Sequence, residues 1–284
     1  MKISFELNDD RIGYNTRFLC DLGRKLEYGE DCVQDYDLAF LCYKTAADHR
    51  DHDGLNCTGW MYLNGFGVPK DVSLAIEYFL QAAEVGNSTA MVNLGNIYEY
   101  GEADIDIDID YERAAAWYKK AMENGDSTGE FNYANMLHWG WGVKQDRAAA
   151  YKHFLQLNIK GHPGTNFYLG LYHELGEVVE QDYGLALYYY EEGAACEEDA
   201  CCNIQLGVMY AKGLGVEKDI DMAIQYYNTA AELGDSLAYS NLAYLYETGE
   251  GVEQDIAEAI RLYRIAAQDG EEHALEALDR LIQE

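Results

Sequence analysis

The chain has 284 residues, of which 49% are hydrophobic, so it carries enough apolar material for a buried core and is not a wholly disordered chain. It contains 20 Lys and Arg residues and 51 Asp and Glu residues, which gives a formal net charge of −31. This charge argues against nucleic acid and anionic membrane surfaces as ligands, because both require cations on the protein, and it permits a basic protein partner.

The N-terminal residues 1–17 contain no apolar run of the length that a signal peptide needs. No stretch of about 18 apolar residues occurs anywhere in the chain, which predicts no membrane insertion. The seven cysteines are odd in number and clustered, which favours reduced thiols over a disulfide framework. We therefore expect a cytoplasmic protein, with export by a system that uses no N-terminal signal peptide as the alternative. Residues 1–17 are expected to cap the structure that follows or to be partly disordered.

From residue 18 onward, one sequence pattern recurs seven times. Its most regular position is an aspartate, which serves below as the anchor of each copy. The anchors are Asp35, Asp71, Asp110, Asp146, Asp182, Asp219 and Asp255. A near-constant period of about 36 residues predicts a stacked-repeat architecture.

The residues after each anchor predict one helix, which we call helix B. In the sixth copy, Asp219 is followed by Ala223, Tyr227 and Ala230, and these spacings place the three side chains on one face of a helix. The anchor aspartate can accept hydrogen bonds from the free N–H groups at the helix start. Gly234, fifteen residues after the anchor, is typical of the left-handed residue that ends a helix.

The residues before each anchor predict a second helix, which we call helix A. In the sixth copy it carries Leu206, Gly207 and Tyr210, and the recurring small residue twelve positions before the anchor lets helix B approach closely. Glycine there costs about 1 kcal/mol of helix propensity, so its recurrence implies a packing role. Residues 213–216, Gly-Leu-Gly-Val, predict the turn that joins A to B.

The stretch "LGVMYAKGLGVEKDIDMAIQYYNTAAELGD" at residues 206–235 resembles the Sel-one-like repeat, a relative of the tetratricopeptide repeat. This resemblance implies an all-α, right-handed α-solenoid, or superhelix, of about seven helix-turn-helix repeats with helix A on the concave face. The repeats are expected at residues 18–54, 55–86, 87–125, 126–161, 162–199, 200–234 and 235–270, followed by a C-terminal capping helix at 271–284. The first, third and fifth copies depart locally from the pattern, with Cys32 and Arg50, an insertion at 103–110, and Glu197.

No catalytic motif stands out, so we predict that the protein is not an enzyme and binds no cofactor. Two segments contain residues that can bind a metal: the loop with His49 and His52, and the acidic run from Asp104 to Asp110. The loop offers no fixed ligand geometry, and the acidic run lacks the glycine and terminal glutamate of a calcium loop, so no metal site is predicted.

The predicted contact surface lies on helix A, at positions 15, 11, 8 and 7 before each anchor. Positions in the third copy are counted from residue 107, because its insertion adds three residues. This surface contains aromatic residues of the kind favoured at binding hot spots, asparagines that can bind a peptide backbone, and glutamates that attract cations. The predicted partner-binding residues are Trp60, Asn96, Glu99, Tyr100, Phe131, Asn135, His138, Trp139, Phe167, Glu174, Tyr244 and Glu247. The alternative is that these side chains only fill gaps between repeats.

The first functional hypothesis is therefore a non-catalytic scaffold or adaptor that binds a partner protein, expected to be basic, on its concave face. Residues 161–260 favour it, because Lys212 and Lys218 are their only cations against nineteen Asp and Glu. The resemblance implies adaptor or scaffold roles, often in bacterial systems. One alternative is an immunity or inhibitor protein that neutralises a basic toxin or effector. Others are a metal-binding or enzymatic module and a binder of small or glycan-derived ligands.

Overall fold

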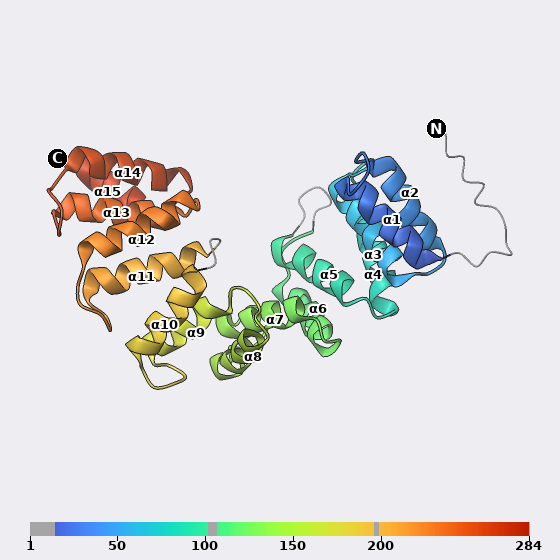
Figure 1. Ribbon diagram of the computed structural model, residues 1–284, viewed down its shortest axis with the longest axis horizontal. Coiled ribbons are helices and arrows are strands. Elements are labelled where there is room, and N and C mark those ends of the chain that lie inside the picture. The colour runs from blue at the N-terminus through green and yellow to red at the C-terminus, as the bar shows by residue number, and fades with distance from the viewer. Residues whose placement is uncertain (1–14, 102–106, 196–198, 284) are drawn as a thin grey trace. The chain divides into compact units, whose positions relative to one another are not determined.

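The fold is an all-α solenoid of seven repeats, each of which contributes two helices, as the repeat pattern predicts. The computed structural model describes residues 15–101, 107–195 and 199–283. The A helices are α1 (Thr16–Tyr28), α3 (His52–Asn64), α5 (Ser88–Tyr100), α7 (Ser127–Trp139), α9 (Thr165–Leu175), α11 (Ala200–Lys212) and α13 (Ser236–Thr248). The B helices are α2 (Tyr36–Asp48), α4 (Val72–Glu84), α6 (Tyr111–Glu123), α8 (Arg147–Ile159), α10 (Tyr183–Ala194), α12 (Ile220–Glu232) and α14 (Ile256–Gln268). A last helix, α15 (Glu272–Gln283), follows them (Figure 1).

The chain divides into two compact units. The N-terminal unit, Met1–Asp146, contains α1 to α7, and the C-terminal unit, Arg147–Glu284, contains α8 to α15. Residues 1–14 of the predicted N-terminal segment lie outside the described residues, and Thr16 already belongs to α1. Each unit is described by itself below.

Six of the anchor aspartates cap their B helices, as predicted. Asp71 accepts a hydrogen bond from the backbone N–H of Leu74 at 2.9 Å, and Asp219 accepts one from Met222 at 3.0 Å. The same contact occurs at Asp35, Asp110, Asp182 and Asp255. An N-cap of this type contributes about 1 kcal/mol to helix stability, so the aspartates that define the period in the sequence also start the helices.

The glycine of helix A packs directly against the large aromatic ring of helix B. A Cβ atom on Gly95 would lie 2.3 Å from the ring of Tyr118, and one on Gly207 would lie 2.4 Å from Tyr227. Both rings are buried in the core. The predicted packing role of the small residue is confirmed, because close contact between the two helices leaves no room for a side chain.

The turn between A and B contacts the preceding repeat. Gly142 has a φ of +65°, and a Cβ atom there would lie 2.0 Å from the main-chain oxygen of Tyr111, the first residue of α6. The rings of Tyr111 and Trp141 stack with their centroids 5.4 Å apart. At the turn of the second repeat, the rings of Tyr36 and Phe66 stack in the same way, with centroids 4.8 Å apart. The second glycine of the turn is therefore an inter-repeat contact as well as a site of positive φ.

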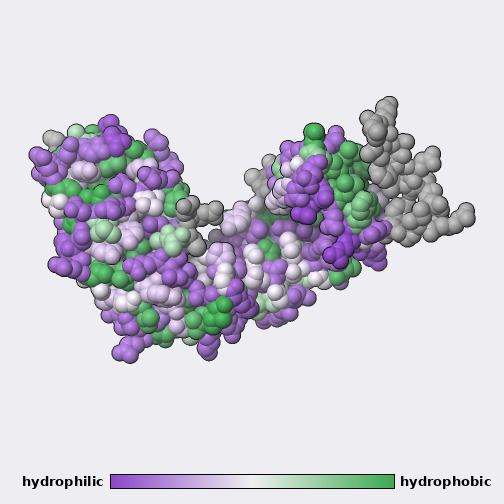
Figure 2. Space-filling view, viewed as in Figure 1, coloured by the Kyte–Doolittle hydropathy of each residue, from purple (hydrophilic) through white to green (hydrophobic). Residues whose placement is uncertain are grey.

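The exposed surface contains both polar and hydrophobic residues. On the face seen in Figure 2, hydrophobic residues form small separate patches among hydrophilic ones. The helices are 11 to 13 residues long, and within the described residues none has the length and apolar character needed to cross a bilayer.

Candidate functional site

Two rows of helix A residues form an exposed surface on each unit, which we call the A-helix face. Row −7 contains the residue seven positions before each anchor, and row −11 the residue eleven before it. Residues four apart lie on the same side of a helix, so the two rows are adjacent. Row −7 is exposed in all seven repeats: Tyr28, Asn64, Tyr100, Trp139, Leu175, Lys212 and Thr248. Row −11 is exposed or half-buried: Arg24, Trp60, Asn96, Asn135, Leu171, Val208 and Tyr244.

Neighbouring A helices contact each other within the units. Helix α1 packs against α3 and α5 against α7 in the N-terminal unit, and α9 packs against α11 in the C-terminal unit. In these three pairs, rows −7 and −11 of successive repeats therefore lie on helices that touch each other.

Four of the predicted contact residues are large exposed aromatic side chains. Trp60 is 39% exposed, Tyr100 73%, Trp139 45% and Tyr244 53%. A solvated helix face does not need such side chains, and exposed tryptophan and tyrosine are the residues that most often dominate binding energy. The structure thus leaves these four rings accessible to a partner.

The other predicted residues are more enclosed. Phe131 and Phe167 are half-buried, and Phe167 packs against the core cluster that contains Tyr190 and Leu206. The remaining half-buried residues of the prediction are Asn96, Glu99, Asn135, Glu174 and Glu247. These side chains are therefore less accessible to a partner than the four exposed rings.

The expectation that His138 is exposed is wrong. Its side chain is 3% exposed and lies edge-on to the ring of Trp139, with centroids 4.5 Å apart. The reason is that the side chains of row −8 point toward the contact between helices A and B. Glu27, in the same row of the first repeat, is also buried, at 8% exposure.

Row −8 carries a structural pair that the sequence reasoning missed. The hydroxyl of Tyr43 donates to Glu27 at 2.8 Å, Tyr190 donates to Glu174 at 2.8 Å, and Tyr263 donates to Glu247 at 2.9 Å. Tyr118 makes the same contact with Glu99. A buried hydroxyl needs a hydrogen-bond partner, so each glutamate satisfies the tyrosine eight residues after the anchor.

The signal for this pairing was present in the sequence. Glutamate in row −8 coincides with tyrosine eight residues after the anchor in the first, third, fifth and seventh repeats. Where phenylalanine replaces the tyrosine, at Phe79 and Phe154, row −8 holds Leu63 and His138. Burial, followed by the contact with Glu99, raises the pKa of Tyr118, which keeps its hydroxyl protonated as the donor.

In the seventh repeat, the pair formed by Glu247 and Tyr263 also contacts a cation, Arg280. Arg280 of α15 places its Nη1 atom 2.6 Å from Oε1 of Glu247, while Oε2 of the same carboxylate accepts the hydrogen bond from Tyr263. The hydrogen bond from Arg280 is the main reason that the pKa of Glu247 is lowered. This ion pair attaches α15 to the last complete repeat.

We expect Arg280→Ala to lower stability in a pH-dependent way. The folded-state pKa of Glu247 lies below the unfolded value of about 4.3, so the stabilisation is fully present above that value and is lost as pH falls through the folded pKa. Because Arg280 is more than half exposed, the expected loss at neutral pH is small, about 0.5–1 kcal/mol.

The measurement is the melting temperature of wild type and Arg280→Ala from neutral pH into the acid range. Arg264→Ala, which removes an exposed cation from the neighbouring helix α14, is the matched control. The gap between wild type and Arg280→Ala should close at low pH, whereas a gap of constant size would contradict the assigned role of Glu247.

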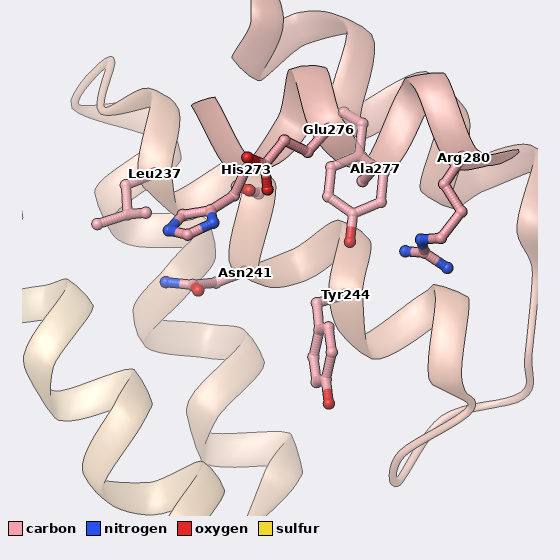
Figure 3. Close-up of a pocket in the computed structure, with 9 residues that line it drawn as sticks. Leu237, Asn241, Tyr244, His273, Glu276, Ala277 and Arg280 are labelled. Carbon is pink, nitrogen blue, oxygen red and sulfur yellow. The ribbon is translucent and has the colours of Figure 1, made fainter. Parts of the chain in front are cut away.

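An open pocket of about 490 Å³ continues the A-helix face at the C-terminal end. Tyr244 and Asn241 reach it from α13, and His273, Glu276 and Arg280 reach it from α15 (Figure 3). Its wall is both polar and apolar, and the pocket is open to solvent. Such a pocket is suited to a side chain of a partner protein more than to an enclosed small molecule.

The predicted absence of a metal site stays a prediction. Within residues 15–101, 107–195 and 199–283, no three His, Cys, Asp or Glu side chains are placed to hold a metal ion. Asp104 and Asp106 of the acidic run lie outside the described residues, as does Cys196. The six described cysteines are free thiols.

A family model matches the chain repeatedly along its length. The family model described as Sel1 repeat matches residues 17–51, 58–87, 88–126, 127–162, 165–197, 202–235 and 236–271. Each matched segment contains one A helix, or most of it, together with the B helix that follows.

Among the proteins similar to this chain are two solved structures and a chitin synthase regulatory factor. The crystal structure of a Sel1 repeat protein from Oxalobacter formigenes is 26% identical, with a TM-score of 0.78, and covers 87% of this chain and 96% of that one. The protective antigen c5321 of uropathogenic Escherichia coli, which displays an SLR fold, is 29% identical, with a TM-score of 0.71, and covers 93% of this chain and 56% of that one. Chitin synthase regulatory factor 4 of Schizosaccharomyces pombe is 27% identical over 128 residues, which are 45% of this chain and 19% of that protein. The chain thus spans about a fifth of the length of this relative.

Proposed function

The chain belongs to the Sel1 repeat family, and on that premise we propose that it is a non-catalytic scaffold or adaptor that binds a partner protein on its A-helix face. The observation that carries this proposal is the exposure of row −7 in all seven repeats, with Tyr28, Tyr100 and Trp139 among its members. Exposed aromatic residues lose little conformational freedom on binding and bury a large area, so they are efficient contact residues.

The partner is proposed to carry a basic surface. The charge of −31 supports this, as does the stretch from Gly161 to Ile260 with two cations and nineteen acids. Opposite charges on two proteins accelerate their encounter and exclude partners of the same sign. The regulatory role named for the S. pombe relative is compatible with an adaptor, and the cytoplasmic location predicted from the sequence belongs to the same proposal.

If charge steers association, the association rate with the partner should fall by about tenfold or more between low and physiological salt. The measurement is stopped-flow or surface-plasmon-resonance kinetics over a salt series, with dissociation rates recorded in parallel. An association rate that does not respond to salt would remove the basic partner from the proposal and leave the A-helix face in place.

The proposal itself is tested by affinity capture from cells of the source organism, with partners identified by mass spectrometry. Two variants are compared with wild type. Tyr100→Ala removes an exposed ring from the A-helix face, and Tyr188→Ala removes a ring of 52% exposure from the B helix α10. The scaffold model expects the same partner with wild type and Tyr188→Ala, and reduced capture with Tyr100→Ala. Equal capture by all three would contradict the assigned face.

A further inference from the structure

In several repeats, an aromatic ring of helix A stacks on a ring of helix B. Tyr62 of α3 stacks on Tyr78 of α4, with centroids 5.7 Å apart and an interplanar angle of 13°. Tyr210 of α11 stacks on Tyr226 of α12, with centroids 5.5 Å apart and an angle of 19°. The first ring of each pair lies nine positions before the anchor, in row −9, and the second lies seven positions after it. The stack is therefore a contact that the repeat reproduces.

In the fifth repeat, a histidine occupies row −9 of this stack. His173 of α9 stacks on Tyr189 of α10 with centroids 5.7 Å apart and an angle of 14°, as the tyrosine pairs do. The ring of Tyr151 in α8, which belongs to the preceding repeat, lies edge-on to His173. Phe40 makes the same contact with Tyr62 in the second repeat. His173 thus joins the fourth repeat to the fifth through a ring of the kind that takes up a proton near neutral pH.

The surroundings of His173 suit a neutral imidazole. The residue is 8% exposed, and its Nε2 atom lies 3.5 Å from the hydroxyl of Tyr151. Its Nδ1 atom is buried and has no hydrogen-bond partner among the described residues. A neutral ring can leave Nδ1 as an unprotonated acceptor, whereas a charged ring carries a proton on both nitrogens. Protonation in place would therefore bury a positive charge together with a donor that has no acceptor.

Burial lowers the pKa of His173 below its ordinary value of 6.5. The carboxylate of Asp182 and the main-chain carbonyl of Glu180 act in the opposite direction and do not outweigh burial. The ionisable side chains that α8 and α10 place against the ring are the two tyrosines described above, and phenols are uncharged near neutral pH. Helix α11 also packs against α9, and its one charged residue is Lys212 at its last position. Burial is therefore the dominant influence on the ring.

We propose that His173 is an acid-sensitive joint between the fourth and fifth repeats. At neutral pH the imidazole is uncharged and holds α9 against α8 and α10 through its ring contacts. An open arrangement of these helices, in which water reaches the imidazole, binds a proton more readily than the packed one. Mild acid therefore shifts the population toward the open arrangement. The inference is independent of the proposed function.

The size of the effect follows from proton binding. Above pH 6.5 the imidazole is neutral in both arrangements, so pH does not change the balance between them. Below that value the open arrangement binds a proton and the packed one does not, until the pH reaches the lowered pKa of the packed ring. The ratio of open to packed molecules should thus rise by up to about tenfold from about pH 7.5 to about pH 5.5.

The first test compares wild type with His173→Tyr, which restores the tyrosine that stacks in row −9 of the second and sixth repeats. Hydrogen–deuterium exchange followed by mass spectrometry reports the opening of α8, α9 and α10. Comparison at equal pH removes the effect of pH on the chemical exchange rate. The exchange rate of wild type relative to the variant should rise by up to about tenfold in these helices over the same pH interval. A ratio that does not change with pH would overturn the proposal.

Two further variants keep the test decisive if His173→Tyr misfolds. His173→Gln retains a polar side chain that takes up no proton, and it should lose the pH response. His273→Gln removes an exposed histidine from α15 in the same unit, and it should retain the response. A response that survives in His173→Gln, or that disappears in His273→Gln, would assign the effect to another residue and reject the joint.

The second test titrates the imidazole directly in the wild-type protein. The Cε1–H resonance of His173 is followed by NMR and assigned by its absence from the spectrum of His173→Gln. Its titration midpoint should lie below pH 6.5. A midpoint at or above this value would mean that Asp182 and the face of the Tyr189 ring stabilise the charged imidazole in place, which would contradict the proposal.

Discussion

Gly142→Ala is expected to destabilise the N-terminal unit by about 3–4 kcal/mol, from a left-handed backbone conformation and an overpacked contact together. The residue has a φ of +65°, which disfavours any side chain. A Cβ atom would also lie 2.0 Å from the main-chain oxygen of Tyr111, and a backbone atom cannot move aside as a side chain can. The two repeats that meet at this turn would have to separate.

Gly125→Ala separates these two causes. Gly125 has a φ of +85°, and a Cβ atom there would have no neighbour within 4 Å, so only the backbone conformation is penalised. Its expected cost is about 1–2 kcal/mol. Chemical denaturation of both variants gives the comparison. Equal losses would mean that the contact between the turn and the preceding repeat contributes nothing to stability.

Trp60→Ala combined with Trp139→Ala is expected to weaken partner binding by about 100-fold, since aromatic hot spots contribute about 2 kcal/mol or more each and the effects are not fully additive. Both rings are accessible, at 39% and 45% exposure. Trp139 also stacks on Trp141 with centroids 5.8 Å apart, so a small loss of stability accompanies the loss of binding.

The measurement is the equilibrium dissociation constant for the captured partner, with far-UV circular dichroism to show that helical content is unchanged. Leu80→Ala combined with Tyr188→Ala is the matched control, because it removes two exposed apolar side chains from the B helices α4 and α10. A dissociation constant that is unchanged by the tryptophan pair would place the binding surface elsewhere on the molecule.

Much of the architecture could be predicted from residues close together in the chain. The anchor aspartates cap helices three residues away, as Asp71 does with Leu74, and Gly95 predicts a close helix contact within its own hairpin. The exposed rings of Trp60, Tyr100, Trp139 and Tyr244 were also predicted, because a strict period keeps rows −7 and −11 on one face. These features depend on spacing alone.

The sequence by itself determined the repeat, its two helices, their caps and the acidic character, since each follows from local spacing or from composition. Only the tertiary structure decided the surroundings of row −8, where His138 is buried and Glu247 contacts Arg280. The physical reason is that burial and hydrogen bonding depend on what the neighbouring helices place opposite a side chain. Those helices belong to the same hairpin and to the next repeat, up to 36 residues away.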